Sequence, residues 1–174
     1  MPQGWELIPF ENICKVITCG YASTPKYEEK GIPFISAKNV KPYNFIYKDY
    51  KYISEALFAK IHCNSRPEKG DILLTRVGAG IGEACIVDIE DVFGIYVSVT
   101  LIKLLYPKMN KYILNLLESP YGLKLSNKNT LGKDASQGNL NVNNVRKFLC
   151  PIPPIMEQTK INNKIFNLYK QIDN

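Results

Sequence analysis

The sequence predicts an α/β (α+β) fold: a mixed, largely antiparallel twisted sheet with flanking helices, followed by a C-terminal helix of the coiled-coil type. Three observations predict it. Apolar segments at residues 71–77, 84–89 and 92–105 are separated by glycines that mark tight turns or bulges. Residues 110–125 have helical periodicity. A second helical pattern covers residues 155–172, after two prolines.

The elements of the first part of the chain follow from local patterns. Residues 5–10 form a short apolar strand, and residues 11–16 suit a helical turn. Residues 20–31 are mostly polar and contain a proline and two glycines, which predicts a loop. Apolar and polar residues partly alternate over 32–40, which indicates a strand, and Pro33 favours its first positions or a sheet edge.

The second part of the chain contains clear start and stop signals. Ser54 suits the N-cap of a short helix, and residues 64–70 form a turn-rich break. Pro120 interrupts the helical pattern and suits the start of a new turn better than a helix interior. Residues 126–144 are polar with little periodicity and predict a long loop, a kind of segment that is usually functional. Residues 148–152 predict a last strand.

The C-terminal helix has an apolar seam whose residues are separated by four, three and four positions, which is the spacing of a coiled coil. We expect residues 1–154 to form one domain and residues 155–174 to begin a spacer or dimerisation helix. The alternative is a helix that folds back onto its own domain. The seam consists of Ile161, Ile165, Leu168 and Ile172.

Composition is that of an ordinary globular protein. Of 174 residues, 45% are hydrophobic and 22% charged, and no apolar run approaches the ~20 residues of a membrane span. The N-terminus lacks the basic and apolar regions of a signal peptide, so we expect a cytoplasmic protein with no membrane contact. The five cysteines are scattered, and His62 is the only histidine, which excludes a histidine-rich zinc site.

Positive charge is concentrated in one part of the chain. The formal net charge is +6, and residues 103–147 carry eight basic residues against two acidic ones. A basic segment of this kind favours a polyanionic partner such as nucleic acid. The alternative is a solvated basic face without a partner.

Enzyme motifs are weak in this sequence. The glycines of residues 78–82 follow an apolar segment, as in a methyltransferase cofactor loop, but the next residues read as a strand where a helix is required. Ile152 and Ile155 flank two prolines where an amino-methylating motif needs a polar and an aromatic side chain. The pattern Glu28-Glu29-Lys30 lacks an upstream acidic partner for nuclease chemistry. The sequence therefore argues against a self-sufficient enzyme and predicts no metal and no cofactor.

Residue types that read or grip DNA are well represented. Arginine, lysine, asparagine and glutamine pair with base edges, while lysines also neutralise phosphates. The predicted base readers lie in loops that flank strands and are Lys38, Asn39, Arg76, Gln137, Asn139 and Asn141. The predicted phosphate contacts are Lys124, Lys128 and Lys133.

Several short segments together resemble the target-recognition domain of the DNA-specificity (S) subunit of type I restriction–modification enzymes. Each segment is weak alone, but their order and spacing span almost the whole chain. They are Gly4-Trp5-Glu6-Leu7, Gly31-Ile32-Pro33-Phe34-Ile35, Lys69-Gly70-Asp71-Ile72-Leu73-Leu74, Gly80-Ile81-Gly82, Gln137-Gly138-Asn139-Leu140-Asn141 and Pro151-Ile152-Pro153-Pro154-Ile155-Met156-Glu157-Gln158.

The resemblance implies a non-catalytic module that reads one half of a bipartite site in double-stranded DNA. It also implies partner methyltransferase (M) subunits and motor/endonuclease (R) subunits, which methylate, translocate and cut. The family's S subunit typically has two such domains separated by long helices. This chain carries one domain and the start of one helix, which is the pattern of a half-subunit, a truncated product or an excised domain. A half-subunit could form a homodimer through the C-terminal helix.

Similar domains are also fused to methyltransferase–endonuclease polypeptides, so the host system stays open. Two other function classes remain as alternatives. One is an assembly or interaction domain whose basic face is incidental. The other is a small S-adenosylmethionine-dependent methyltransferase that uses the glycine turn.

Overall fold

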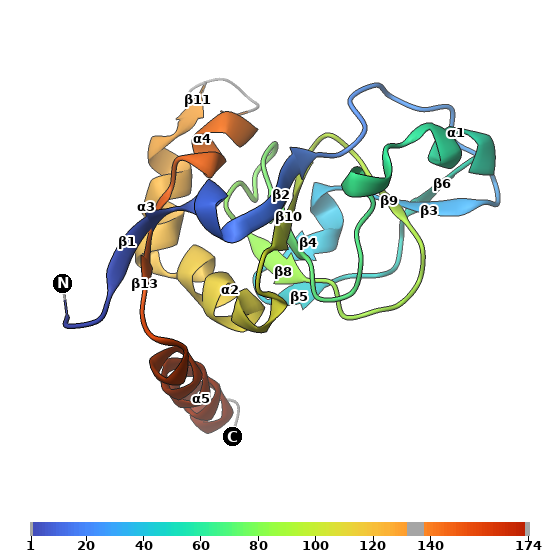
Figure 1. The fold of residues 1–174 in the computed structure, drawn as a ribbon. Coiled ribbons are helices and arrows are strands. Elements are labelled where there is room, and N and C mark those ends of the chain that lie inside the picture. Colours follow the sequence, from blue (N-terminus) through green and yellow to red (C-terminus); the bar gives the residue numbers. More distant parts are fainter. Residues whose placement is uncertain (1, 132–137, 173–174) are drawn as a thin grey trace.

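The computed structural model describes residues 2–131 and 138–172 (Figure 1). The strands are β1 Glu6–Pro9, β2 Cys14–Cys19, β3 Ile32–Ile35, β4 Val40–Lys41, β5 Asn44–Phe45, β6 Lys51–Ile53, β7 Ile72–Thr75, β8 Ala84–Ile86, β9 Gly94–Ile95, β10 Val99–Leu104, β11 Thr130–Leu131, β12 Asn139–Leu140 and β13 Leu149–Ile152. The α-helices are α1 Glu55–Lys60, α2 Asn110–Glu118, α3 Pro120–Lys128, α4 Val142–Arg146 and α5 Ile155–Ile172. The 3₁₀ turns are Phe10–Ile13, Ala37–Asn39, Cys63–Ser65 and Pro107–Met109.

A four-stranded antiparallel sheet of order β2-β10-β7-β8 forms the centre of the fold. Its central strands β7 and β10 are buried along their whole length. Since successive side chains of a strand point to opposite sides, both faces of these strands are covered. Ile72 and Ile102 pack with Ile113 of α2 in one core cluster. Leu73 and Leu101 belong to a second cluster on the other face. This two-sided burial explains why residues 72–74 are consecutive apolar residues in the sequence.

The two ends of the chain meet in a separate two-stranded sheet. Strand β1 pairs antiparallel with β13, with Glu6 opposite Ile152. Gly4 has a positive φ of 80° and lies against Pro154, where a Cβ would approach within 3.3 Å of the proline ring. The first and last of the matching sequence segments are therefore neighbours in space.

A smaller three-stranded sheet of order β6-β3-β9 lies beside the central sheet, with α1 next to it (Figure 1). Its β3–β9 pair is parallel, so the sheets are largely but not wholly antiparallel, as expected. Ser54 is the N-cap of α1: its Oγ accepts a hydrogen bond from the backbone N–H of Leu57 at 3.1 Å. Pro120 occupies the first turn of α3, as expected.

Three boundaries differ from the sequence-based expectations. The helical turn expected over 11–16 is the 3₁₀ turn Phe10–Ile13, after which β2 begins. The strand expected over 32–40 ends at Ile35, and a 3₁₀ turn follows. The strand expected over 92–105 is broken at residues 96–98.

The long loop expected over 126–144 was wrong for its described residues. Helix α3 continues to Lys128, β11 pairs with β12, and α4 follows. Ser126 is 1% exposed and packs beneath Gly82, which holds the last turn of α3 in place. Strands β11 and β12 and helix α4 are too short to produce a periodic pattern in the sequence.

Helix α5 starts at the end of the molecule opposite to β11 and α4 (Figure 1). It contacts α2: Ile161 packs against the main core cluster, and Asn115 Nδ2 donates to Asn162 Oδ1 at 2.8 Å. Gln158 is 4% exposed and its Nε2 donates to the carbonyl of Pro153 at 2.9 Å, which fixes the entry into the helix. Within the described residues, no helix combines the length and hydropathy needed to cross a membrane.

Candidate nucleic-acid interface

Loops from distant parts of the chain meet at one end of the central sheet. Gly20 N–H donates to the carbonyl of Val99 at 3.1 Å, and the backbone N–H of Ala37 donates to Ser98 Oγ at 3.1 Å. Figure 1 shows the end of β2, the turn after β7, and α4 at this end of the molecule. We call this region the loop edge, and it comprises residues 20–24, 36–39, 76–83, 96–98 and 139–141.

The loop edge contains described members of the set of residues predicted to contact DNA. Lys38, Asn39, Arg76, Asn139 and Asn141 come from three separate chain segments that the fold brings together. Sequence reasoning had no means of placing them at one end of one sheet. The burial and the hydrogen bonds of each of these five side chains decide whether it is open to a ligand or holds the loop edge together.

Arg76, one of the predicted base readers, is part of the scaffold of the loop edge in this structure. Its side chain is buried, at 8% exposure, and all three guanidinium nitrogens donate within the protein. Nε binds the carbonyl of Leu140 at 3.1 Å, and Nη1 binds the carbonyl of Val97 at 3.0 Å. Nη2 binds Asn139 Oδ1 at 2.8 Å. A side chain used in this way holds the loop edge together.

Asn39, another predicted base reader, is also engaged within the protein. It is 1% exposed, and its Oδ1 accepts from the backbone N–H of Ser36 at 3.2 Å. Its Nδ2 donates to the carbonyls of Ile46 and Lys48, both at 2.9 Å. The amide thus satisfies backbone groups on both sides of the β4–β5 pair.

Asn139 and Asn141 are exposed but are also used within the protein. Asn141 is the N-cap of α4, because its Oδ1 accepts from the backbone N–H of Asn143 at 2.8 Å. Asn139 lies on β12, in a bridge with Val77. Both residues present their side chains at the surface of the loop edge.

Three predicted lysine contacts are exposed. Lys38 lies on the 3₁₀ turn of the loop edge, and Lys124 and Lys128 lie on α3. Helix α3 adjoins the loop edge because a Cβ on Gly82 would lie 3.1 Å from Ser126 Cβ. The other two predicted contacts, Lys133 and Gln137, lie outside the described residues.

Some residues of the loop edge were missed by sequence reasoning. Tyr96 and Ser98 lie in the break between β9 and β10, and Thr24 Oγ1 lies 3.3 Å from Tyr96 Oη. In the sequence, Ser98 alternates with Val97 and Val99 as in a half-buried strand, which conceals the turn. Lys41 was also missed, and its Nζ lies 3.3 Å from Glu83 Oε2.

The glycines of residues 78–82 form a turn between two antiparallel strands. Leu74 pairs with Ala84, so β8 returns alongside β7 with no intervening helix. Gly78 and Gly82 have positive φ values of 109° and 96°, which favour glycine. A nucleotide-cofactor loop requires a crossover helix here, and the chain has a hairpin instead.

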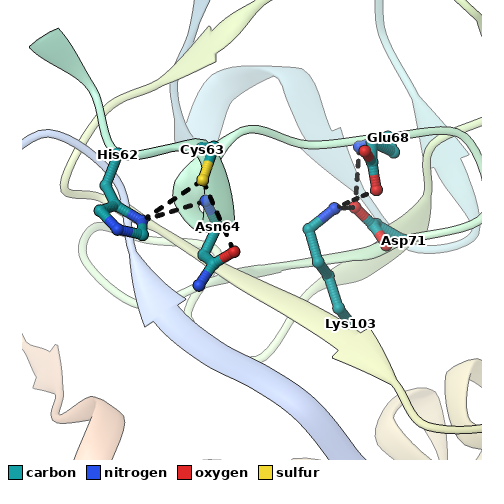
Figure 2. Close-up of polar contacts among 6 residues, drawn as sticks. All are labelled: His62, Cys63, Asn64, Glu68, Asp71 and Lys103. Carbon is teal, nitrogen blue, oxygen red and sulfur yellow. Dashed lines mark hydrogen bonds and ion pairs between the residues drawn. The ribbon is translucent and has the colours of Figure 1, made fainter.

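Two further polar clusters lie away from the loop edge's hydrogen bonds (Figure 2). His62 Nδ1 accepts from the backbone N–H of Asn64 at 3.2 Å and lies 3.9 Å from Cys63 Sγ. The imidazole therefore caps the 3₁₀ turn that contains Cys63. In the stretch 2–131 and 138–172, no group of three or more His, Cys, Asp or Glu side chains is placed to hold a metal ion.

The second cluster is an ion triad at the central sheet (Figure 2). Lys103 is 8% exposed, and its Nζ lies 2.6 Å from Asp71 Oδ2 and 2.7 Å from Glu68 Oε2. Burial alone would lower the pKa of Lys103, but its hydrogen bonds to the two carboxylates raise it overall. The hydrogen bond from Lys103 lowers the pKa of Glu68. This triad joins the start of β7 to β10 and serves stability.

The predicted seam of α5 is divided between its own domain and solvent. Ile161 and Ile165 are half-buried, whereas Leu168 is 50% exposed; the side chain of Ile172 lies outside the described ones. A groove of about 810 Å³ remains between α5, α2 and the β4–β5 turn. Its apolar lining includes Tyr43, Phe45, Leu114, Ile165, Phe166 and Tyr169.

The fold and the loop edge define a mixed α/β domain with a set of polar loops at one end of its central sheet and a long helix at its C-terminus. Residues 2–174 match the family described as the type I restriction modification DNA specificity domain. The chain belongs to this family.

Solved structures with the same fold agree with this assignment. The HsdS subunit from Thermoanaerobacter tengcongensis matches with a TM-score of 0.70 and 17% identity, over 99% of this chain and 39% of that one. A chain of a type I R-M system, from work on complex assembly and conformational transition, matches with a TM-score of 0.66 and 19% identity, over 99% and 40%. The type I restriction-modification system S subunit from M. genitalium matches with a TM-score of 0.62 and 14% identity, over 98% of this chain and 40% of that one.

At these identities the likeness concerns the fold. This chain spans about 40% of the length of the chains it matches.

Proposed function

We propose that this chain is a sequence-specific DNA-binding module that reads one half of a bipartite site in double-stranded DNA. The family match over residues 2–174 carries this proposal, and the loop edge supplies the surface. Exposed lysines on that surface neutralise phosphates, and exposed amides contact groove edges. The module itself is non-catalytic and acts in the cytoplasm.

Its partners are the methyltransferase (M) and motor/endonuclease (R) subunits of the same type I system. Residues 1–154 form the recognition domain in this proposal, and residues 155–174 begin the spacer helix. The recognition surface and the helix lie at opposite ends of the molecule (Figure 1). This arrangement lets one end engage DNA while the other is bound by protein.

A homodimer through α5 would use only part of the predicted seam. Ile161 is already packed against the core of its own domain, so Leu168 is the described seam residue most open to a second copy. Phe166 is 58% exposed and lies on the same helix. We propose that any dimer forms along the outer half of α5, beyond its contact with α2.

The salt dependence of binding to a duplex tests the proposed DNA surface. Replacing Lys124 or Lys128 by alanine should reduce affinity for all sequences and flatten the plot of log affinity against log salt by about 0.9 per lost phosphate contact. Lys164→Ala is the matched control, since Lys164 is an exposed lysine of α5 at the other end of the molecule. Equal slopes in all three variants and the native chain would remove α3 from the interface.

A further inference from the structure

Arg76 fixes the orientation of the Asn139 side chain at the loop edge. The guanidinium carries only N–H donors, so the atom of the Asn139 amide that faces it at 2.8 Å must be the oxygen. The Nδ2 group then lies on the other branch of the amide. Within the described part of the chain, no hydrogen bond uses Asn139 Nδ2, and the residue is exposed.

Arg76 is itself held firmly. Its Nε and Nη1 bind two backbone carbonyls, and its own backbone N–H donates to the carbonyl of Ser98 at 2.9 Å. The backbone N–H of Leu140 donates to the carbonyl of Arg76 at 2.8 Å. Among the residues placed in the structure, no carboxylate pairs with this buried cation, so carbonyl and amide oxygens alone satisfy it. The amide of Asn139 is one of the groups that compensate its charge, which disfavours a flip of that amide.

We propose that Arg76 is a positioning residue that presets Asn139 as a hydrogen-bond donor to DNA. This inference rests on the proposed function and adds the chemistry of one contact. The ligand atom is a hydrogen-bond acceptor of the duplex, either a phosphate oxygen or the acceptor edge of a base. Bidentate pairing with adenine would require the Asn139 oxygen to accept a second hydrogen bond beside that of Arg76, whereas a contact through Nδ2 alone uses only the open donor.

Asn139→Asp separates the two functions of this side chain. Aspartate keeps an oxygen for Arg76 and gains an ion pair, so the folded state should be retained, whereas the donor is replaced by an acceptor. Asn127→Asp is the control, because Asn127 is an exposed residue of the adjoining α3 and adds the same charge. The affinity of each full-length variant is measured on two duplexes of equal length. One is the duplex that the native chain enriches from a random duplex library, and the other has the same bases in scrambled order.

The donor role predicts that Asn139→Asp has an unfolding temperature equal to or above that of the native chain. It also predicts that the affinity of Asn139→Asp for the duplex is about tenfold lower than that of Asn127→Asp. An equal loss on both duplexes identifies a phosphate as the acceptor, and a loss confined to the selected duplex identifies a base. Equal affinities of the two aspartate variants would overturn the inference. Absence of binding by the native chain to either duplex would contradict the proposed function itself.

Arg76→Lys tests the positioning role independently, with Arg66→Lys as its control. Arg66 also donates three hydrogen bonds to backbone carbonyls, but at the C-terminal end of α1. Lysine cannot reproduce a three-way guanidinium contact. We expect Arg76→Lys alone to reduce affinity, by about as much as Asn139→Asp. Native affinity in Arg76→Lys, with both variants folded, would show that Asn139 needs no positioning.

Discussion

The side chains of Asn115 and Asn162 join α2 to α5 through an amide–amide hydrogen bond of 2.8 Å. This contact lies between the recognition domain and the helix that was expected to be its free spacer. Tyr43 and Tyr169 reinforce it with an edge-on ring contact whose centroids are 5.6 Å apart. One face of α5 is therefore docked on its own domain as far as Tyr169, while Phe166 and Leu168 stay at least half exposed.

Asn115→Ala should loosen α5 without unfolding the domain. We expect the free energy of unfolding to fall by about 1 kcal/mol, the usual net contribution of one hydrogen bond. Urea unfolding measures the change, and Asn162→Ala with the double variant completes a cycle. A coupling energy of zero between the two sites would show that the amide pair contributes nothing to docking.

Ile161→Ala and Leu168→Ala should differ although both residues belong to the predicted seam. Ile161 packs on the core, so its truncation should cost about 1–2 kcal/mol of unfolding free energy. Leu168 is 50% exposed, and its truncation should leave monomer stability within about 0.5 kcal/mol. Thermal unfolding and sedimentation of both variants check this. Comparable destabilisation would contradict the docked position of α5.

Lys103→Met should be strongly destabilising because it leaves the largely buried carboxylate of Asp71 without its cation. Removing one partner of a buried ion pair typically costs about 3–5 kcal/mol. Asp71 is 12% exposed on its side chain and Lys103 is 10% exposed. Lys69→Met is the control, since its pair with Glu90 is open to solvent and should contribute nothing measurable. Similar unfolding midpoints for the two variants would refute a structural role for the triad.

Stability should fall as pH rises above 9, because two buried thiols resist ionisation. Burial raises the pKa of Cys85 and Cys150 from 9.0 to about 12. Between these values the unfolded chain releases the two protons while the folded chain keeps them, so unfolding becomes easier with rising pH. Each thiol should contribute a slope of about −1.4 kcal/mol per pH unit.

Cys150→Ala isolates this contribution. The small cavity that this variant creates lowers the free energy of unfolding at every pH. Above pH 9, however, its free energy of unfolding should fall less steeply with pH than that of the native chain, because one thiol proton fewer is released on unfolding. Urea unfolding at several pH values, under reducing conditions, gives both slopes. An unchanged slope would mean that the Cys150 thiol ionises in the folded protein.

Strong local signals predicted elements of the fold correctly. Ser54, Pro120 and the start of α5 at Ile155 all have local chemical causes, namely capping and the geometry of proline. The elements between Thr130 and Arg146 could not be predicted in the same way. They are a two-residue strand pair and one short helix, held by contacts with residues far away in the sequence, and a pattern of two residues has no period.

The predicted site residues differ in how far the fold leaves their side chains free. Asn39 and Arg76 have the residue types of base readers, but the fold encloses both and uses their polar groups on backbone carbonyls. Asn139 is exposed, but its amide oxygen accepts a hydrogen bond from Arg76. Residue type and loop position therefore indicated the correct region of the molecule, and the environments of individual side chains had to come from the structure.

Selection from a random duplex library with the purified chain, at low and then physiological salt, tests the central claim most directly. The account predicts enrichment of one short half-site that survives physiological salt, and the symmetry of the enriched site reports a monomer or a dimer. Salt-sensitive binding without enrichment would contradict sequence reading by this chain alone. No binding at low salt would contradict the assignment of the loop edge as a DNA surface.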